Sequence, residues 1–388
     1  MFRVHIYTGS LALVGRSGVG QAANHQLRAL RAAGAQTVTR WQPAADVIHL
    51  NTVLPCSLLA ARRARRRGVP VVWFGHSTEA DFRHSFVGSD LLAPLFRRWI
   101  CHCYNQADLV LTPTPYSARI LRGYGLRPPV QALSNGVDTA FFAPSAPHGA
   151  AFRQKYDLTA ADRVVVSAGH YMQRKGILDF IALARSMPQV RFFWFGYTPP
   201  SLVPRPVRRA MAGAPANLCF PGYVSQEELR NAYCGADAFV FCSHEETEGI
   251  VVLEALACGV PVLLRDIPVY NDWLRDGVEV YKAADTAALR IKLAALLAGR
   301  LPDVTAAGHN FLTGTVRFVQ NFFIRRTHLG AILLDVNSRT RHGRRPYHFF
   351  PLCPGPCEGG CPARGQTTNK ASCHYIESGP PCAVQDGP

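Results

Sequence analysis

The chain has 388 residues, of which 48% are hydrophobic and 10% aromatic, which excludes a mainly disordered protein and leaves room for two domains. The formal net charge of +16 is unevenly spread: residues 1–145 carry 16 Lys or Arg against 6 Asp or Glu, and residues 146–300 carry 17 against 15. The basic excess indicates an anionic partner, either nucleic acid or anionic lipid. Nucleic acid is disfavoured because the sequence contains no recognisable nucleic-acid-binding module. It also contains no run of 18 apolar residues, so nothing in it is expected to span a membrane.

The first elements are predicted to be strands of a parallel sheet. Residues 2–7 predict a first strand, and this segment lacks the long apolar core of a signal peptide. A glycine-rich loop around Gly18 follows, where the backbone could approach a phosphate or a sugar, although an ordinary tight turn explains the glycines equally well. Residues 45–52 and 69–78 each contain an apolar run, as strands buried on both faces do.

His76 lies at the carboxyl end of the strand predicted over residues 69–78, where ligands bind in open α/β sheets. A lone histidine is more often structural, but a neutral imidazole at this place could hydrogen-bond a sugar hydroxyl. The polar stretch that follows is a candidate acceptor-facing segment, and its polar residues are Ser77, Glu79, Asp81 and Arg83.

Residues 91–104 mix leucines, aromatic residues and arginines. This pattern favours a helix that packs on its own domain or, alternatively, lies on a membrane surface. Further on, Asn135 and Gly136 predict a turn, and residues 143–151 are rich in Pro, Ala and Gly, which predicts an interdomain linker. We therefore predict an α/β protein with two Rossmann-like, doubly wound domains, residues 1–145 and residues 152–305.

The clearest chemistry follows the apolar strand predicted over residues 236–242. Helical spacing begins after Gly249, with Ile250 first on the apolar face. Glu246 lies in the loop and Glu254 in the helix, with seven residues between them. A helix N-terminus here suits a phosphate, and the two carboxylates can accept hydrogen bonds from sugar and ribose hydroxyls. Either glutamate alone would more simply be an exposed carboxylate, but the pair in this frame favours a ligand site.

Beyond the next predicted strand, Arg265 and Asp266 are further candidates for facing an acceptor. The glutamate pair and its frame resemble the nucleotide-sugar site of the glycosyltransferases of family 4, which have the GT-B fold. Other segments agree with a bacterial glycolipid subgroup of that family: HSTEADFRHSF (76–86), LTPTPYSARIL (111–121), LSNGVDTAFF (133–142), RKGILDF (174–180), FFWFGYTP (192–199) and RDIPVYNDWL (265–274).

The resemblance covers residues 1–305 and implies two domains facing a cleft, with UDP-glucose as the donor bound by the second domain. Lys175, joined by Arg174, would bind the pyrophosphate. The sequence departs from the family at His170, which replaces a common arginine. Glu254 would bind the ribose and Glu246 the transferred sugar. The other implied donor contacts are Gly18, Tyr223, Val224, Gly249 and Ile250, and neither a metal nor another cofactor is expected.

The resemblance further implies a glucosyl-diacylglycerol acceptor, with His76 and Glu246 as catalytic residues and with retention of the anomeric configuration. The protein would then be cytoplasmic and peripheral, on the anionic inner face of a bacterial cell membrane, with no nucleic-acid partner. Glucose and galactose differ in the stereochemistry of one hydroxyl, so galactosyl transfer to the same acceptor stays open. A sugar-nucleotide epimerase of the same fold would leave the glycolipid-type segments unexplained.

Residues 306–388 depart from the family, whose members end in a helix that braces the first domain. This tail is rich in Pro, Gly and Cys without periodicity, which predicts an irregular, disordered segment or one read from a shifted frame. Its five cysteines, between Cys353 and Cys382, lack standard zinc-site spacing. The seven earlier cysteines lie among apolar neighbours, which favours free thiols. An inactive membrane-binding protein is therefore a second hypothesis beside the enzyme.

Overall fold

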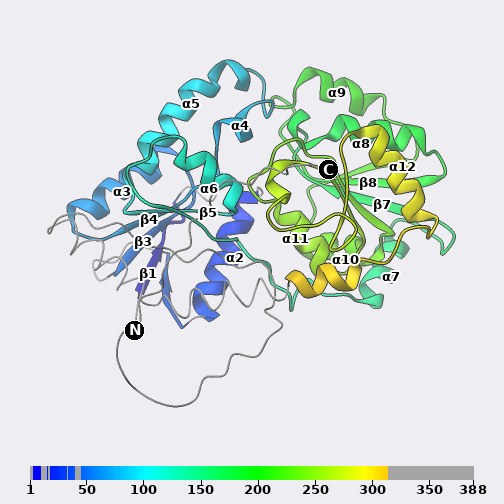
Figure 1. Ribbon diagram of the computed structural model, residues 1–388, viewed down its shortest axis with the longest axis horizontal. Helices are drawn as coiled ribbons and strands as arrows, with labels where there is room; N and C mark the ends of the chain where they lie inside the picture. The colour runs from blue at the N-terminus through cyan, green and yellow to red at the C-terminus, as the bar shows by residue number, and fades with distance from the viewer. Residues whose placement is uncertain (1–2, 10–14, 16–17, 33, 40–44, 313–388) are drawn as a thin grey trace, which may run out of the picture. The chain divides into compact units, whose positions relative to one another are not determined.

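The computed structural model describes residues 3–9, 15, 18–32, 34–39 and 45–312, all within one compact unit (Figure 1). The predicted irregular tail lies outside the described residues from residue 313 onward, and so do its five cysteines. The seven earlier cysteines are free thiols, as predicted.

The first sheet has six parallel strands in the order β2-β1-β3-β4-β5-β6. We call this sheet and its helices the first lobe. Its strands are β1 (Arg3–Ile6), β2 (Gln36–Val38), β3 (Val47–Leu50), β4 (Val71–Phe74), β5 (Leu109–Thr112) and β6 (Val130–Ala132). Its helices are α2 (Gly18–Ala32), α3 (Pro55–Arg66), α4 (Glu79–Phe82), α5 (Ser89–Tyr104) and α6 (Pro115–Arg122).

The second sheet also has six parallel strands, in the order β12-β11-β10-β7-β8-β9. We call this sheet and its helices the second lobe. Its strands are β7 (Arg163–Ala168), β8 (Val190–Phe195), β9 (Leu218–Gly222), β10 (Ala238–Phe241), β11 (Val262–Arg265) and β12 (Tyr281–Ala283). Its helices are α7 (Ala146–Lys155), η1 (Gln173–Lys175), α8 (Ile177–Ser186), α9 (Arg205–Ala212), α10 (Gln226–Gly235), α11 (Ile250–Ala257), η2 (Pro268–Tyr270) and α12 (Thr286–Leu297).

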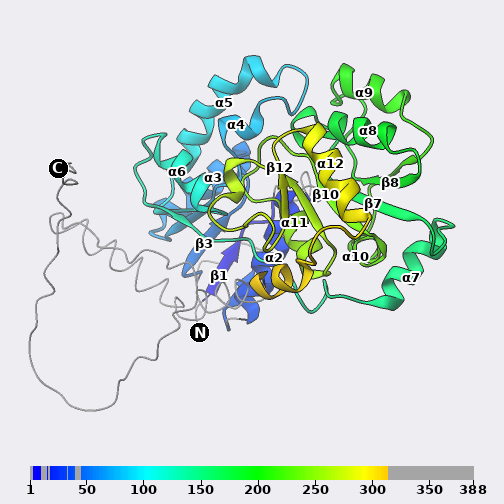
Figure 2. The same ribbon diagram turned by 45° about the vertical axis from the view of Figure 1, so that its right-hand side comes forward.

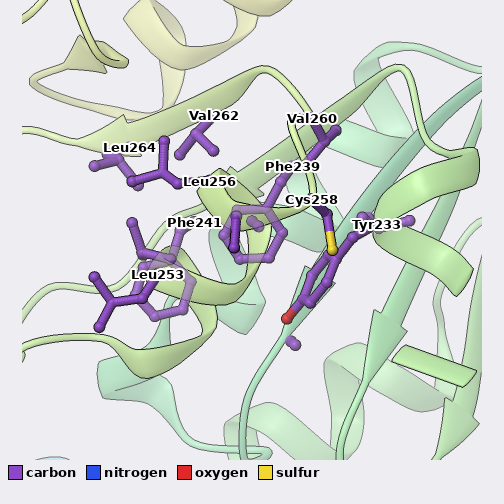
Figure 3. Packing of buried hydrophobic residues seen from close by; sticks show 14 of the residues in the cluster. Tyr233, Phe239, Phe241, Leu253, Leu256, Cys258, Val260, Val262 and Leu264 are labelled. Carbon is purple, nitrogen blue, oxygen red and sulfur yellow. The ribbon is translucent and has the colours of Figure 1, made fainter. Parts of the chain in front are cut away.

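Strand β10 shows why a buried strand of this sheet is apolar at every position. Phe239 and Phe241 point to one face, where they pack with helix α11 and strand β11 (Figure 3). Ala238 and Val240 point to the other face and join a second cluster. Successive side chains of a strand alternate between faces, so a strand covered on both sides needs a continuous hydrophobic run. This confirms the interpretation of residues 236–242 as a buried strand.

Each sheet reverses its strand order at one place. In the first sheet β1 lies between β2 and β3, and in the second sheet β7 lies between β8 and β10. The chain therefore leaves β7 and β10 toward helices on opposite faces of the sheet, α8 and α11, and the switch point lies between these two strands. Ligands of doubly wound proteins bind at such a switch point.

The predicted linker is mostly helix. Helix α7 starts at Ala146, where the Ser145 hydroxyl accepts a hydrogen bond from the backbone N–H of His148. It packs against α10 (Figure 2), and the approach is close, since a Cβ on Gly149 would lie 2.6 Å from the backbone oxygen of Cys234. The linker prediction for residues 143–151 was therefore wrong over most of its length, and the domain bounds 1–145 and 152–305 stay a prediction.

Candidate active site

The loop after β7 is held against the loop after β10. Gly176 ends η1 with φ +74°, a conformation that L side chains rarely adopt. A Cβ at this position would lie 2.1 Å from the backbone oxygen of Cys242, so only glycine fits. The N–H of His244 also donates to the backbone oxygen of Arg174 at 2.8 Å. These contacts bring the lysine loop and the glutamate loop together at the switch point.

Lys175 and Glu246 form a buried ion pair there. Lys175 Nζ lies 2.5 Å from Glu246 Oε1, and the Ser243 hydroxyl donates to the same oxygen at 2.7 Å. Burial acts to raise the pKa of Glu246, but Lys175 and Arg174 outweigh it and hold that pKa below its usual value. Burial lowers the pKa of Lys175 although Glu246 opposes the shift. Glu246 is thus a carboxylate that accepts hydrogen bonds.

A hollow of about 310 Å³ opens beside this pair. Gly249, with φ +89°, ends the glutamate loop, and the N-terminus of α11 begins at Ile250. Such a helix end presents free N–H groups and a positive dipole. Predicted site residues that line this hollow are Gly18, His76, Arg174, Lys175, Glu246, Gly249 and Ile250.

Glu254 lines a neighbouring hollow of about 130 Å³ together with Tyr223 and Val224. Its carboxyl accepts a hydrogen bond from the Tyr233 hydroxyl at 3.2 Å, and burial raises its pKa to about 8. The two hollows adjoin, because they share the wall residues Gly18, Ala168, Gly169, His170, Ile250 and Val251. The structure therefore places both predicted glutamates along one extended depression.

His76 faces the larger hollow from the first lobe. Its ring stacks on Phe74 with centroids 4.7 Å apart, and its Nε2 lies 3.0 Å from Asn51 Oδ1. Burial lowers the pKa of His76 to about 3, and the nearby His49 adds to this effect. The imidazole is therefore neutral at physiological pH, as expected of a hydrogen-bonding group.

Sequence comparison decides the family. The family described as Glycosyltransferase Family 4 matches residues 12–141, and the family described as Glycosyl transferases group 1 matches residues 150–307. Processive diacylglycerol alpha-glucosyltransferase of Acholeplasma laidlawii is 40% identical over 273 residues, which are 70% of this chain and 81% of that protein. The chain belongs to glycosyltransferase family 4. Alpha-galactosylglucosyldiacylglycerol synthase of Streptococcus pneumoniae is 31% identical over 278 residues, 69% of this chain and 74% of that protein.

Solved structures agree on the fold of this glycosyltransferase. Anabaena Alr3699/HepE in complex with UDP and glucose superposes with a TM-score of 0.68 at 14% identity, covering 84% of this chain and 99% of that one. Sucrose-phosphate synthase from Thermosynechococcus elongatus gives a TM-score of 0.68 at 17% identity, covering 87% and 100%. The predicted GT-B fold is confirmed by these structures, and the prediction of an enzyme is confirmed by the sequence relatives above. Within the described ranges, His, Cys, Asp and Glu form no group of three or more that could hold a metal ion.

Arg174 of this glycosyltransferase, predicted to bind the pyrophosphate, is already bound to protein groups of both lobes. Its guanidinium lies 2.9 Å from Asp81 Oδ1 and donates to the Ser85 hydroxyl at 3.1 Å and to the backbone oxygen of Glu245 at 2.7 Å. The side chain is only 8% exposed. Arg174 therefore connects the two lobes, and a pyrophosphate would have to compete with these partners.

Four acceptor candidates are not brought to the hollows. Glu79 and Arg83, at the two ends of α4, pair with each other at 2.7 Å, and neither residue lines the larger hollow. Arg265 is buried and lies 3.0 Å from Asp179, and Asp266 is half exposed beyond β11, one strand away from the switch point. None of the four lines either hollow, and their role toward an acceptor stays a prediction. Asp81, from the same polar stretch, does line the larger hollow.

Sequence reasoning missed Asn135 and Glu248, which both line the larger hollow. The Asn135 amide donates to Glu248 Oε2 at 2.6 Å, and burial raises the pKa of Glu248 to about 7. Gly136 does turn, with φ +69°, as predicted. No short-range signal marks this contact, because the two side chains lie 113 residues apart in sequence.

Proposed function

We propose that this enzyme transfers glucose from UDP-glucose to a glucosyl-diacylglycerol, giving a diglucosyl-diacylglycerol with retention of the anomeric configuration. The names of the two relatives, a diacylglycerol alpha-glucosyltransferase and an alpha-galactosylglucosyldiacylglycerol synthase, support a glycolipid product. The observation that carries the proposal is the buried Lys175–Glu246 pair beside the N-terminus of α11. It supplies a cation for phosphate and a carboxylate for a sugar at one switch point.

The donor would lie along the two adjoining hollows. Lys175 and the N-terminus of α11 suit the pyrophosphate, because charge-assisted hydrogen bonds are the strong ones. Glu254 and Tyr223, in the smaller hollow, are then in reach of the ribose and the uracil. Glu246 would hold the hexose in the larger hollow. Its lowered pKa suits this task, since an ionised carboxylate accepts hydrogen bonds from sugar hydroxyls.

The chemistry we propose is a front-face displacement. The bond between the hexose C1 and the phosphate oxygen breaks, the acceptor hydroxyl oxygen bonds to C1 on the same face, and its proton passes to the leaving phosphate. The carboxylates of the described hollow are all engaged, Asp81 by Arg174, Glu246 by Lys175 and Glu248 by Asn135. This engagement favours a mechanism without a covalent carboxylate intermediate. Neutral His76 would hydrogen-bond the hexose from the opposite lobe.

The acceptor would be reached from an anionic membrane surface. Val87, Leu91, Leu92 and Leu95, at and before the start of α5, are 50–86% exposed. Helix α3 lies alongside α5, with Arg62 bonded to His102, and it carries the basic run. Leucines next to arginines are the chemistry of a peripheral surface on anionic lipid. None of the helices among the described residues has the length and apolar content to cross a bilayer.

The test is turnover by the full chain in mixed micelles. UDP-glucose and UDP-galactose are each offered with diacylglycerol and with α-glucosyl-diacylglycerol, and the product linkage is determined. Glucose transfer to the glucosylated acceptor with an α linkage supports the proposal. If galactose is transferred in preference, the donor is UDP-galactose instead of UDP-glucose. No transfer in any combination, with liposome binding intact, would instead support the inactive membrane-binding hypothesis.

A further inference from the structure

The loop that carries Glu246 is also bound from the other lobe. Thr114 Oγ1 donates to the backbone oxygen of Thr247 at 2.8 Å. The Tyr116 hydroxyl donates to the carboxylate of Glu245 at 3.0 Å. Together with the Asn135 amide on Glu248, these hydrogen bonds reach three of the residues that flank Glu246. The proposed function assigns no role to Thr114 and Tyr116, although both belong to the segment LTPTPYSARIL.

The three donors are each fixed within the first lobe. Thr114 is the N-cap of α6 in a capping box with Ser117, and Tyr116 lies in the first turn of that helix. Asn135 is buried and its Oδ1 accepts from the Gln26 amide of α2 at 3.0 Å. A capped helix end and a bonded amide are rigid supports. The first lobe therefore presents a preorganised set of donors to the glutamate loop.

Among the described residues, the hydrogen bonds to the Glu246 carboxylate come from its own lobe, from Lys175 and Ser243. The residues on both sides of Glu246 are held from the first lobe. We propose that Thr114, Tyr116 and Asn135 are positioning residues that set Glu246 for hexosyl transfer when the lobes are together. This rests on the proposed role of Glu246. A shift of about 1 Å in a group that orients a substrate can lower a rate by about 100-fold.

Tyr116→Phe tests the proposal because it removes one hydroxyl and leaves the ring. Its matched control is Tyr156→Phe, since the Tyr156 hydroxyl also donates to a glutamate, Glu228, at 2.8 Å, but outside the hollows. Burial raises the pKa of Glu245 to about 7, so loss of this hydrogen bond corresponds to a change of up to about tenfold. We expect kcat to fall by about that factor in Tyr116→Phe, with the Kd for UDP within about twofold of wild type, and neither to change in Tyr156→Phe. Merely structural loosening would lower UDP affinity as well.

Thr114 provides a second test, with its own rescue. Thr114→Ala removes the donor to Thr247 and the cap of α6, whereas Thr114→Ser keeps the hydroxyl for both. We expect Thr114→Ala to lower kcat as Tyr116→Phe does and Thr114→Ser to retain it within about threefold. Equal loss in the two variants would overturn the positioning role of the hydroxyl.

A measurement without substrate separates this inference from the proposed function. Amide hydrogen exchange of the peptide spanning residues 243–249 is compared between ligand-free wild type and Tyr116→Phe. Faster exchange in the variant supports the positioning role even if the wild-type protein transfers no hexose from the two UDP-sugars. Unchanged exchange together with unchanged kcat overturns the inference, and hexosyl transfer by the wild-type protein would then still stand.

Discussion

Lys175 Nζ and Glu246 Oε1 lie 2.5 Å apart, and this contact joins the two loops that leave the switch-point strands β7 and β10. The same distance occurs between Lys155 and Glu228 on the surface. The two pairs differ in burial: the side chains are 16% and 5% exposed in the first, and 54% and 22% in the second. Breaking a buried pair leaves one charge without a partner or water. Although the two distances are equal, the loss of the buried pair should therefore cost more free energy than the loss of the surface pair.

Lys175→Ala should therefore destabilise the protein by about 3–5 kcal/mol and lower UDP affinity, because Glu246 loses its partner and the pyrophosphate its cation. Lys155→Ala is the control, and should cost no more than about 1 kcal/mol. Denaturant unfolding gives the free energies and calorimetry gives the UDP affinity. Similar costs in the two variants would contradict the role assigned to burial.

Glu254→Gln should change how the free energy of unfolding depends on pH. Burial raises the pKa of Glu254 from 4.5 to about 8, so the folded protein keeps a proton that the unfolded chain releases. Folding is then progressively disfavoured as pH rises from about 4.5 to 8, by up to about 1.4 kcal/mol per unit. Glutamine carries no such penalty. The free energy of unfolding of Glu254→Gln relative to wild type should increase over this range, measured by urea unfolding at several pH values, and a flat difference would contradict the raised pKa.

Asn51→Asp should change the titration of His76. The Asn51 oxygen lies 3.0 Å from His76 Nε2 and carries no charge, and burial holds the pKa of His76 at about 3. A carboxylate at that place favours the imidazolium and should raise this pKa by about 1–3 units. Proton NMR of the imidazole would show no titration of His76 from pH 5 to 8 in wild type and an upward-shifted pKa in the variant. Asn51→Ala, which adds no charge, should leave His76 neutral over the same range.

Much of the fold and part of the site could be predicted because their signals are local. Buried parallel strands are continuous apolar runs, so β4 and β10 stand out. Glu246 and Glu254 have seven residues between them within one strand-loop-helix unit, so their shared depression follows from a single local pattern.

Contacts between residues far apart in the chain leave no local pattern in the sequence, so they could not be predicted. Whether Glu79 or Asp81 faces the hollow depends on the phase of one helical turn, which a four-residue helix does not reveal in its sequence. Arg265 is an acceptor candidate in the sequence, but Asp179 lies beside it in space. The segment around Ser145 is a different case. Its Ser-Ala-Pro start is a helix N-cap signal, and this local signal predicts the helix better than the Pro, Ala and Gly content of residues 143–151 predicts a linker.

Gly176→Ala tests how the lysine loop is held. Gly176 and Gly277 have nearly equal φ angles, +74° and +71°, but a Cβ meets nothing within 4 Å at Gly277 and the Cys242 carbonyl at Gly176. Gly277→Ala should therefore cost about 1–2 kcal/mol from conformation alone. Gly176→Ala should cost roughly 1–3 kcal/mol more and also weaken UDP binding, because relief of the overlap moves Lys175. Thermal unfolding of both variants measures the loss of stability, and calorimetry measures the UDP affinity. Equal losses of stability would show that the lysine loop and the glutamate loop are not in tight contact at Gly176.

Replacement of Leu91 and Leu95 by aspartate should release the protein from anionic vesicles. These side chains are 86% and 63% exposed on α5, and each leucine that enters the bilayer interface contributes about 1.5–3 kcal/mol. The double variant should therefore bind vesicles containing phosphatidylglycerol at least about tenfold more weakly in a sedimentation assay. Ile291→Asp is the control, because Ile291, on α12 of the second lobe, is 63% exposed, as Leu95 is. Equal loss in both proteins would mean that added negative charge, rather than this leucine surface, controls membrane binding.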